Sequence, residues 1–215
     1  MKLKKKWIRL SRSNRLYQLD IPILGLTGGV ASGKSTFSKW LKSDGFPVID
    51  ADLIIKSIYA QQKTYHFFLG NHSSYIDQLI QKIDLKKLRK DFFADTKLQT
   101  SVNQFLFTYF QEEFLKQAQP FFSKGFLIYD APLIFEKNLH HQIDQVITIY
   151  CSEANQIQRL TSRDNIDRNL AMEMIKQQLP NQIKIDGSAY SIANDGDLAE
   201  LNLSYLKFKS EFFES

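Results

Sequence analysis

The stretch GGVASGKST, residues 28–36, decides the fold of this 215-residue chain. It satisfies the pattern G-x-x-x-x-G-K-[ST], in which a glycine-rich turn points backbone N–H groups at phosphate oxygens. The apolar residues 21–27 precede it and predict a buried strand, while Phe37, Trp40 and Leu41 follow at helical spacing. A helix that begins near Lys34 would add the positive end of its dipole to the loop. We therefore predict a phosphate-binding loop between a strand and a helix.

The loop supplies most of the residues that we expect to bind a nucleotide. The ammonium group of Lys34 would contact the β- and γ-phosphates, and the Ser35 hydroxyl would hold Mg²⁺. A purely structural turn is the alternative, and the flanking strand and helix argue against it. The loop residues expected to contact the nucleotide are Gly28, Gly29, Ala31, Ser32, Gly33, Lys34, Ser35 and Thr36.

Strand candidates alternate with helix candidates along the rest of the chain. Residues 45–52 predict a turn and a short strand, residues 126–130 and 145–150 predict two more strands, and residues 189–193 a fifth. Residues 198–213 predict a closing helix. This alternation, with a phosphate loop on the first strand, favours an α/β fold: a five-stranded parallel sheet flanked by helices.

A long segment between the second and third predicted strands has a different pattern. From about residue 53 to residue 120 there are few glycines or prolines, and apolar side chains recur at helical spacing. The segment therefore predicts a helical insertion into the α/β domain.

Composition limits the classes of protein to which the chain can belong. With 215 residues and 43% hydrophobic content, it can bury the core of one α/β domain and a smaller appended region. Its single cysteine, Cys151, rules out an internal disulfide framework. No stretch approaches the length of about 18 apolar residues that a membrane span needs. We expect a cytoplasmic location.

The net charge of +5 comes from the first 20 residues. Seven lysines and arginines precede the first acid, Asp20, so the remaining 21 basic and 23 acidic residues carry a net charge of −2. A basic tail of this kind is able to contact RNA or an anionic membrane. We favour a solvated extension or an extra edge strand, with no stable nucleic-acid or membrane partner.

Acidic and basic side chains at the predicted strand ends are candidates for phosphoryl-transfer chemistry. Asp52 could orient or deprotonate an acceptor hydroxyl, and Asp50 could support Mg²⁺ through water. Helix capping is the alternative role for either aspartate. Arg159 and Arg163 lie four residues apart on one helix face and could embrace phosphates. The structural alternatives are contacts of Arg163 with Asp164 or of Arg159 with Glu153.

Three stretches together resemble the signatures of the dephospho-CoA kinase family. They are LTGGVASGKST (residues 26–36), VIDAD (residues 48–52) and DAPLIFE (residues 130–136). Residues 159–164 are similar to the lid helix of that family, residues 178–180 to the following turn, and residues 194–196 to its adenine-side loop.

The resemblance implies transfer of the ATP γ-phosphate to the ribose 3′-hydroxyl of dephospho-CoA, and a monomer or weak homo-oligomer. It implies a kinase domain over residues 21–215, with an acceptor-binding insertion at 61–120 and a lid at 152–180. Residues 1–20 lie outside the resemblance, and their charge predicts a basic extension. The resemblance implies that Asp52 is the catalytic base and that Lys34, Arg159 and Arg163 are catalytic cations. It implies adenine-side binding for Asn194 and Gly196, and Mg²⁺ binding for Ser35 and Asp50. The residues that it implies for acceptor binding are Asp52, Pro132, Leu133 and Glu136.

The chain departs from the family pattern at several positions. Asn103-Gln104 and Asp84-Leu85 stand in the insertion where His-Pro and Asp-Arg are usual, Ala193 replaces an aspartate, and Ala31 replaces a glycine. Two alternatives therefore stay open. One is a kinase of the same architecture for another nucleotide-like or small hydroxyl acceptor, and the other is an ATP-binding protein without transferase activity.

Overall fold

The computed structural model describes residues 2–77, 79–92 and 95–214. The chain divides into two compact units, of which one comprises Met1–Asp50 and Ala118–Ser215 and the other Ala51–Gln117. Each unit has its own buried apolar cluster. Among the described residues, no helix is both long enough and apolar enough to cross a membrane. The first unit carries the phosphate loop, and the second contains most of the predicted insertion.

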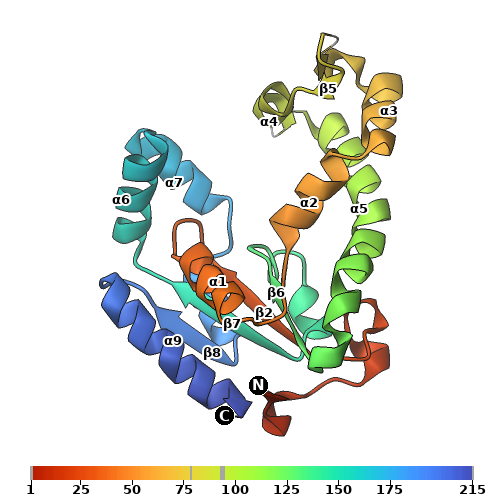
Figure 1. Cartoon of the computed structure of the whole chain (residues 1–215). Helices are drawn as coiled ribbons and strands as arrows, with labels where there is room; N and C mark the ends of the chain where they lie inside the picture. Colours follow the sequence, from red (N-terminus) through yellow and green to blue (C-terminus); the bar gives the residue numbers. More distant parts are fainter. Residues whose placement is uncertain (1, 78, 93–94, 215) are drawn as a thin grey trace. The chain divides into compact units, whose positions relative to one another are not determined.

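A five-stranded sheet forms the centre of the first unit (Figure 1). Its strands lie in the order β3-β6-β2-β7-β8, and every pairing between neighbours is parallel. All six residues of β2 are buried, because it lies between two other strands and both of its faces are covered. The predicted five-stranded parallel sheet is confirmed. The strands are β2 (Ile23–Gly28), β3 (Val48–Asp50), β6 (Leu127–Asp130), β7 (Gln145–Tyr150) and β8 (Tyr190–Ala193).

Helices α1 (Lys34–Ser43) and α9 (Leu198–Phe212) share one apolar cluster with the sheet. Phe37 of α1 packs edge-on against Tyr205 of α9, with ring centroids 5.2 Å apart. At Gly25 of β2, an added Cβ would lie 2.8 Å from the Cδ1 atom of Ile134 and would clash with it. The other helical elements of this unit are α6 (Glu153–Asp164), α7 (Arg168–Lys176) and α8 (Asn181–Asp186), with short 3₁₀ turns at Gln119–Lys124 and Leu139–Gln142.

Side-chain caps mark where several of these helices begin. The Ser152 hydroxyl accepts the N–H of Asn155 at the start of α6, and the Asp167 carboxylate accepts the N–H of Leu170 at the start of α7. Asp197 caps α9 by accepting N–H groups of the first turn at 2.8 and 2.9 Å. Such caps satisfy N–H groups that have no partner within the helix.

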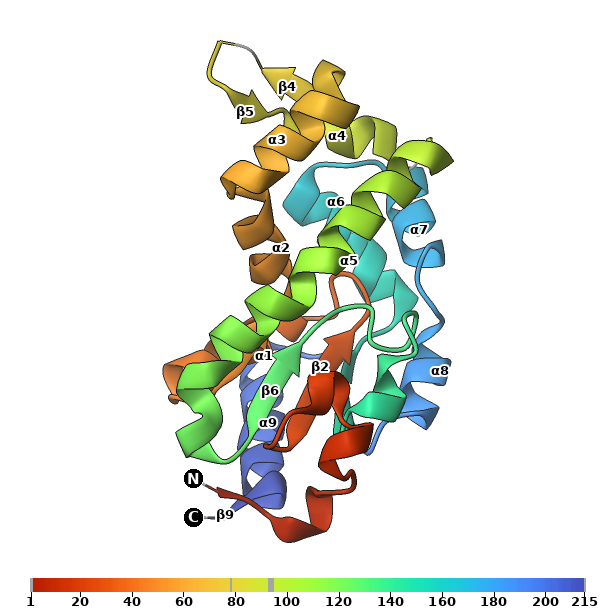
Figure 2. The ribbon, with the colours of Figure 1, turned by 90° about the vertical axis from the view of Figure 1, so that its right-hand side faces the viewer.

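The N-terminal segment is packed into the first unit and is not a solvated extension. The alternative, an extra strand, is present in short form but lies outside the main sheet. Strand β1 (Lys2–Leu3) pairs antiparallel with β9 (Phe213–Glu214), in a small sheet separate from the main one (Figure 2). Trp7 stacks on Phe212 with ring centroids 4.3 Å apart. Short 3₁₀ turns follow at Lys5–Trp7, Arg12–Asn14 and Leu16–Gln18.

Arg15 anchors this segment most firmly. Its Nε donates to Asp144 Oδ2 at 2.7 Å, and the two side chains are only 4% and 0% exposed. Asp144 also accepts the backbone N–H groups of Arg9, Leu10 and Ile23. Burial opposes ionisation of this carboxyl, but the bonds from Arg15 and from the backbone prevail and lower its pKa. At least one of the seven positive charges of the N-terminal segment, that of Arg15, is therefore buried and neutralised inside the protein.

The second unit is mainly helical. Phe68, Leu88, Leu98 and Val102 form much of its buried core. The predicted helices are present, but the short antiparallel hairpin β4–β5 was not predicted. Two residues per strand are too few to show an alternating pattern. The elements are α2 (Ala51–Tyr59), α3 (Gln62–Asn71), a 3₁₀ turn (Ser73–Tyr75), β4 (Ile76–Asp77), β5 (Lys82–Ile83), α4 (Leu85–Phe92) and α5 (Thr96–Ala118), whose last residue belongs to the first unit.

Candidate functional site

The phosphate loop connects β2 to α1 and has little room for side chains. A Cβ at Gly28 would lie 2.3 Å from the backbone oxygen of Ile149, and one at Gly33 would lie 2.0 Å from Asn194 Nδ2. Gly33 has a φ of 95°, which suits glycine, but Ala31 also has a positive φ, of 57°. A left-handed backbone costs a residue with a Cβ about 1–2 kcal/mol. Ala31 is therefore held against its own preference.

Lys34 begins α1, and its ammonium group forms an ion pair with the carboxylate of Asp130. Asp130 is the last residue of β6, it is 2% exposed, and it is the register partner of Leu26 in the central strand. The pair thus lies at the carboxyl edge of the sheet, next to the strand that leads into the loop. Parallel α/β sheets bind ligands at this edge.

Asp50 and Asp52 differ in their placement. Asp50 ends β3 and is the register partner of Asp130, so two carboxylates follow adjacent strands. Its Oδ2 atom also accepts a hydrogen bond of 3.0 Å from Lys42 Nζ. Asp52 lies in the first turn of α2, in the second unit, and is exposed.

Both arginines of α6 have partners in the structure. Arg159 donates to the backbone oxygens of Ala31 at 3.3 Å and of Asn194 at 2.8 Å, and so ties the loop to the turn after β8. Arg163 binds the two carboxylate oxygens of Asp164, each at 2.7 Å, and this hydrogen bonding lowers the pKa of the Asp164 carboxyl. The structural alternative for Arg163 is therefore present. Among the described residues, Arg159 forms no ion pair with Glu153.

The turn formed by residues 194–196 contacts both the phosphate loop and helix α6. Asn194 Nδ2 donates to the backbone oxygen of Ser32 at 2.7 Å. Asp195 accepts the backbone N–H of Ser152, which lowers the pKa of the Asp195 carboxyl. At Gly196 an added Cβ would lie 1.9 Å from an oxygen of Glu200. The side-chain amide of Asn194 therefore already binds the backbone of the phosphate loop.

The segment after β6 is held by an ion pair between a partly buried glutamate and a fully buried lysine. Glu136 Oε1 accepts a hydrogen bond from the N–H of Leu179 at 3.1 Å and lies 2.7 Å from Lys184 Nζ. Lys184 is fully buried. Earlier in the segment, Pro132 accepts a hydrogen bond from the Thr27 hydroxyl with its backbone oxygen, and Leu133 is 37% exposed. Leu133 is thus the more accessible of the predicted acceptor-contacting residues here, and Glu136 has a structural partner.

The sequence pattern does not reveal several residues that the structure brings to the phosphate loop or to the segment after β6. Asp130 was part of a quoted signature but received no role, although an acid that ends a predicted strand was a usable signal. Gln156 and Gln178 both bind the Val30 peptide, and Lys184 pairs with Glu136. These partners come from positions more than 40 residues away, so no local pattern announces them.

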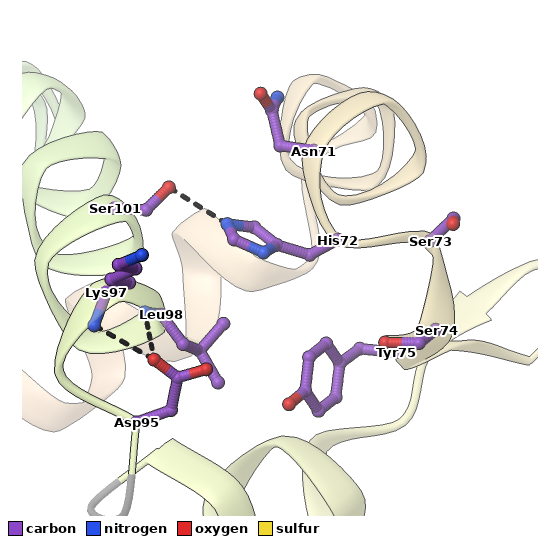
Figure 3. Close-up of a pocket in the computed structure, with 9 residues that line it drawn as sticks. All are labelled: Asn71, His72, Ser73, Ser74, Tyr75, Asp95, Lys97, Leu98 and Ser101. Atoms are coloured by element: carbon purple, nitrogen blue, oxygen red, sulfur yellow. Dashed lines mark hydrogen bonds between the residues drawn. The ribbon is translucent and has the colours of Figure 1, made fainter.

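A pocket of about 510 Å³ opens in the second unit (Figure 3). The imidazole of His72 points toward α5, where its Nε2 atom lies 2.9 Å from the Ser101 hydroxyl. The Asp95 carboxylate accepts the backbone N–H groups of Lys97 and Leu98, so it caps α5. The wall of the pocket is mostly polar, which suits a ligand with hydroxyl, amide or phosphate groups. It is lined by Asn71, His72, Ser73, Ser74, Tyr75, Asp95, Lys97, Leu98 and Ser101.

The positions where the insertion departs from the family pattern are accessible. Asn103 and Gln104 are exposed on α5, and Gln104 lines a shallow pocket of about 370 Å³ with Lys97 and Ser101. Leu85 is 44% exposed at the start of α4. The side chains at these positions are therefore not part of the apolar core of the second unit.

The parallel sheet, the glycine-rich loop on its central strand and the lysine at the start of α1 define this chain as a protein with the fold of the P-loop kinases. A family model for dephospho-CoA kinase (CoaE) matches residues 22–200. The chain belongs to the dephospho-CoA kinase family.

Named relatives agree with this assignment. The chain is 33% identical to the dephospho-CoA kinase of Fusobacterium nucleatum over 187 residues, which is 85% of this chain and 94% of the relative. It is 34% identical to that of Oceanobacillus iheyensis over 184 residues, 84% and 92% of the two chains.

Two solved structures show the same fold. A protein from Thermus thermophilus superposes with a TM-score of 0.75 at 19% identity, covering 90% of this chain and 99% of that one. The dephospho-CoA kinase from Campylobacter jejuni superposes with a TM-score of 0.64 at 23% identity, covering 88% and 96%.

Proposed function

We propose that this protein transfers the γ-phosphate of ATP to the ribose 3′-hydroxyl of dephospho-CoA, giving coenzyme A and ADP. The observation that carries the proposal is a phosphate loop whose lysine is ion-paired at the carboxyl edge of the sheet, in a chain of the dephospho-CoA kinase family. In such a transfer the protein mainly positions the reactants and stabilises charge. The new bond joins the 3′-oxygen to the γ-phosphorus, and the bond from that phosphorus to the β–γ bridging oxygen breaks.

The phosphate loop binds the triphosphate in this proposal. Backbone N–H groups of residues 28–36 contact the phosphates, and Lys34 exchanges the carboxylate of Asp130 for phosphate oxygens. Mg²⁺ fits the available donors, since this ion prefers a few carboxylate or hydroxyl oxygens together with substrate phosphates and water. Ser35 and Asp50 would hold it, and Asp130 is a third candidate because it ends the neighbouring strand. When bound, the ion would neutralise charge on the β- and γ-oxygens.

Asp52 is the proposed base, and it accepts the proton of the acceptor hydroxyl. Arg159 and Arg163 are the proposed lid cations, within a lid at residues 152–180. The Arg163 side chain is 62% exposed, and among the described residues its ion-pair partner is the neighbouring Asp164. Such an exposed pair contributes little to stability, so a phosphate can replace it. Arg159 contacts the backbone oxygen of Ala31 in the loop, which supports a role for this arginine beside a bound nucleotide. Asn194 and Gly196 are the proposed residues on the adenine side.

The acceptor is proposed to bind the insertion at residues 61–120 together with Pro132, Leu133 and Glu136. The polar pocket around His72 supports this proposal, because dephospho-CoA offers phosphates, amides and hydroxyls to such groups. A variant Lys97→Ala should raise KM for the acceptor several-fold and leave KM for ATP unchanged. Lys124→Ala, an exposed lysine outside the insertion, is the matched control.

A second candidate function is a kinase of the same fold for another nucleotide-like or small hydroxyl acceptor. The observation that favours it is the exposed Asn103-Gln104 and Leu85, which change the insertion surface and not its core. Chemical differences at an accessible surface alter ligand choice more readily than they alter folding.

The deciding experiment measures ADP formation with dephospho-CoA, adenosine, other nucleosides and shikimate as acceptors. We expect ADP release to depend on dephospho-CoA, with ³¹P NMR showing a new phosphomonoester at the ribose 3′-position. Lys34→Ala should abolish this signal. Faster turnover with another acceptor would favour the second candidate, and ATP binding without any acceptor-dependent ADP would refute both kinase assignments.

A further inference from the structure

Two glutamine side chains hold the peptide groups on either side of Val30 in the phosphate loop. The backbone N–H of Val30 donates to Gln178 Oε1 at 2.7 Å, and the backbone oxygen of Val30 accepts a hydrogen bond from Gln156 Nε2 at 2.7 Å. A backbone N–H only donates and a carbonyl only accepts, so each amide has a defined orientation. Both the N–H and the C=O of this loop residue are therefore satisfied by side chains.

The two glutamines, Gln156 and Gln178, form a clamp on Val30, which immediately precedes the left-handed residue of the loop. Val30 is followed by Ala31, whose φ is 57°. The backbone oxygen of Ala31 is itself bound by Arg159. A backbone conformation that a residue disfavours persists where its surroundings over-determine it. Gln156, Gln178 and Arg159 are the groups that do so here.

The clamp leaves little freedom on its other side. Gln156 is 3% exposed, and a Cβ added at Gly29 would lie 2.6 Å from its Nε2 atom. Val30 and Ala31 also pack against Ile157 and Leu160, in a cluster formed with α6 and α7. The loop and the base of α6 are therefore packed as one body.

Gln178 is the more adjustable half of the clamp. It lies beyond α7 and is partly exposed, and its neighbour Leu179 is bound by Glu136. Gln177, adjacent and of the same residue type, has an exposed side chain. The chain thus offers a matched pair in which one glutamine touches the loop and the other points to solvent.

We propose that Gln178 is a positioning residue that keeps the phosphate loop ready for nucleotide by holding Ala31 in its left-handed conformation. The proposal rests on the assignment of residues 28–36 as the nucleotide site. Without the Gln178 bond, Ala31 relaxes toward negative φ, and the following N–H groups turn away from the phosphates. Nucleotide binding then has to restore the conformation and becomes weaker.

The test compares ATP binding by Gln178→Leu and Gln177→Leu, each in the wild-type chain and in an Ala31→Gly background. We expect Gln178→Leu to raise the Kd for ATP about fivefold to tenfold, the worth of one hydrogen bond, and Gln177→Leu to leave it unchanged. In the Ala31→Gly background the effect of Gln178→Leu should shrink to about twofold, because glycine adopts positive φ without help. Gln178→Glu, which keeps an acceptor for the Val30 N–H, should restore most of the affinity.

Melting temperatures without nucleotide separate this role from a structural one. The proposal requires Gln178→Leu and Gln177→Leu to melt within a few degrees of each other. A Kd ratio that is the same in both backgrounds, or a loss of stability with unchanged Kd, overturns it. Since ATP binding needs no acceptor, failure to phosphorylate dephospho-CoA would refute the proposed function and leave this test valid.

Discussion

Single residues at the carboxyl edge of the sheet show which roles local chemistry can reveal. The motif alone predicts a phosphate-binding role for Lys34, from the position of this lysine relative to the glycines. Its partner Asp130 is 96 residues away; the sequence marks it as an acid that ends a predicted strand, but the pairing of β6 beside β2 is needed to place it next to Lys34. The ion pair holds the ammonium group at the edge of the sheet, and under the proposed function a nucleotide phosphate would take the place of the Asp130 carboxylate.

Asp52 is the residue whose proposed role can be tested most directly. We expect Asp52→Asn to lower the single-turnover rate of transfer by about 10²–10⁴-fold, because an amide of the same shape cannot accept the hydroxyl proton. ATP affinity should stay within twofold of wild type. Rapid-quench measurements would decide the question, with Asp20→Asn as an exposed control outside the site. If the variant retains more than about a tenth of the rate, Asp52 acts at most as a positioning group.

Among the secondary-structure elements, those with a strong pattern were predicted and the smallest were not. The apolar run before the loop marks β2, and helical spacing marks α1 and α9. Hairpin β4–β5 has too few residues for any period to be visible. The contact between α8 and the segment after β6 could not be predicted either, because it depends on an ion pair between Lys184 and Glu136, which are distant in the sequence.

The Glu136–Lys184 pair should stabilise the elements that it joins only while both charges are present. We expect Lys184→Met to lower the free energy of unfolding by about 1–3 kcal/mol, since it leaves the partly buried Glu136 carboxylate without its counter-charge. Adding Glu136→Gln should recover part of this loss, because glutamine is neutral and still accepts the N–H of Leu179. Urea unfolding of the two single variants and the double variant measures the coupling, with Lys176→Met as the exposed control. Additive losses would contradict a coupled pair.

In the molecule as a whole, the first unit is built from both ends of the chain. Residues before Asp50 and after Ala118 share one sheet and one apolar cluster, while the second unit forms its own core. The sequence predicted the sheet and the helical insertion, because both have local patterns. The sequence did not predict the packing of the basic N-terminal segment, because the number of charges in a segment does not show which of them are paired. Arg15 is paired with Asp144, which lies 129 residues further along the chain.

Stability in acid should report on this buried pair. The lowered pKa of Asp144 means that its stabilising effect is complete above its unfolded-state pKa of about 3.9 and is lost as pH falls through the folded-state value. We expect the unfolding free energy of the wild type to fall steeply below about pH 4. Asp144→Asn should be about 3–5 kcal/mol less stable at pH 7, because Arg15 is left buried without a counter-charge, and its stability should depend less on pH in that window.

The control for this prediction is the exposed pair Arg12–Asp20. Its side chains are 66% and 63% exposed, so Asp20→Asn should cost no more than about 1 kcal/mol and keep the wild-type acid profile. Guanidinium unfolding at several pH values between 3 and 7 supplies the comparison. Equal acid profiles for wild type and Asp144→Asn would assign the acid sensitivity to other carboxyls.

The pairing of β1 with β9 makes this chain suitable for circular permutation, in which the two ends are joined and the backbone is opened elsewhere. Lys2 and Glu214 are register partners, and the two chain ends lie close together in both views (Figures 1 and 2). A short glycine-rich peptide joining these residues would let the backbone be opened instead at the exposed Lys124–Gly125 bond. We expect this circular permutant to refold and to bind ATP with wild-type affinity. A permutant opened within β2, between Leu26 and Thr27, should not refold, because that break severs the strand on which the loop is built.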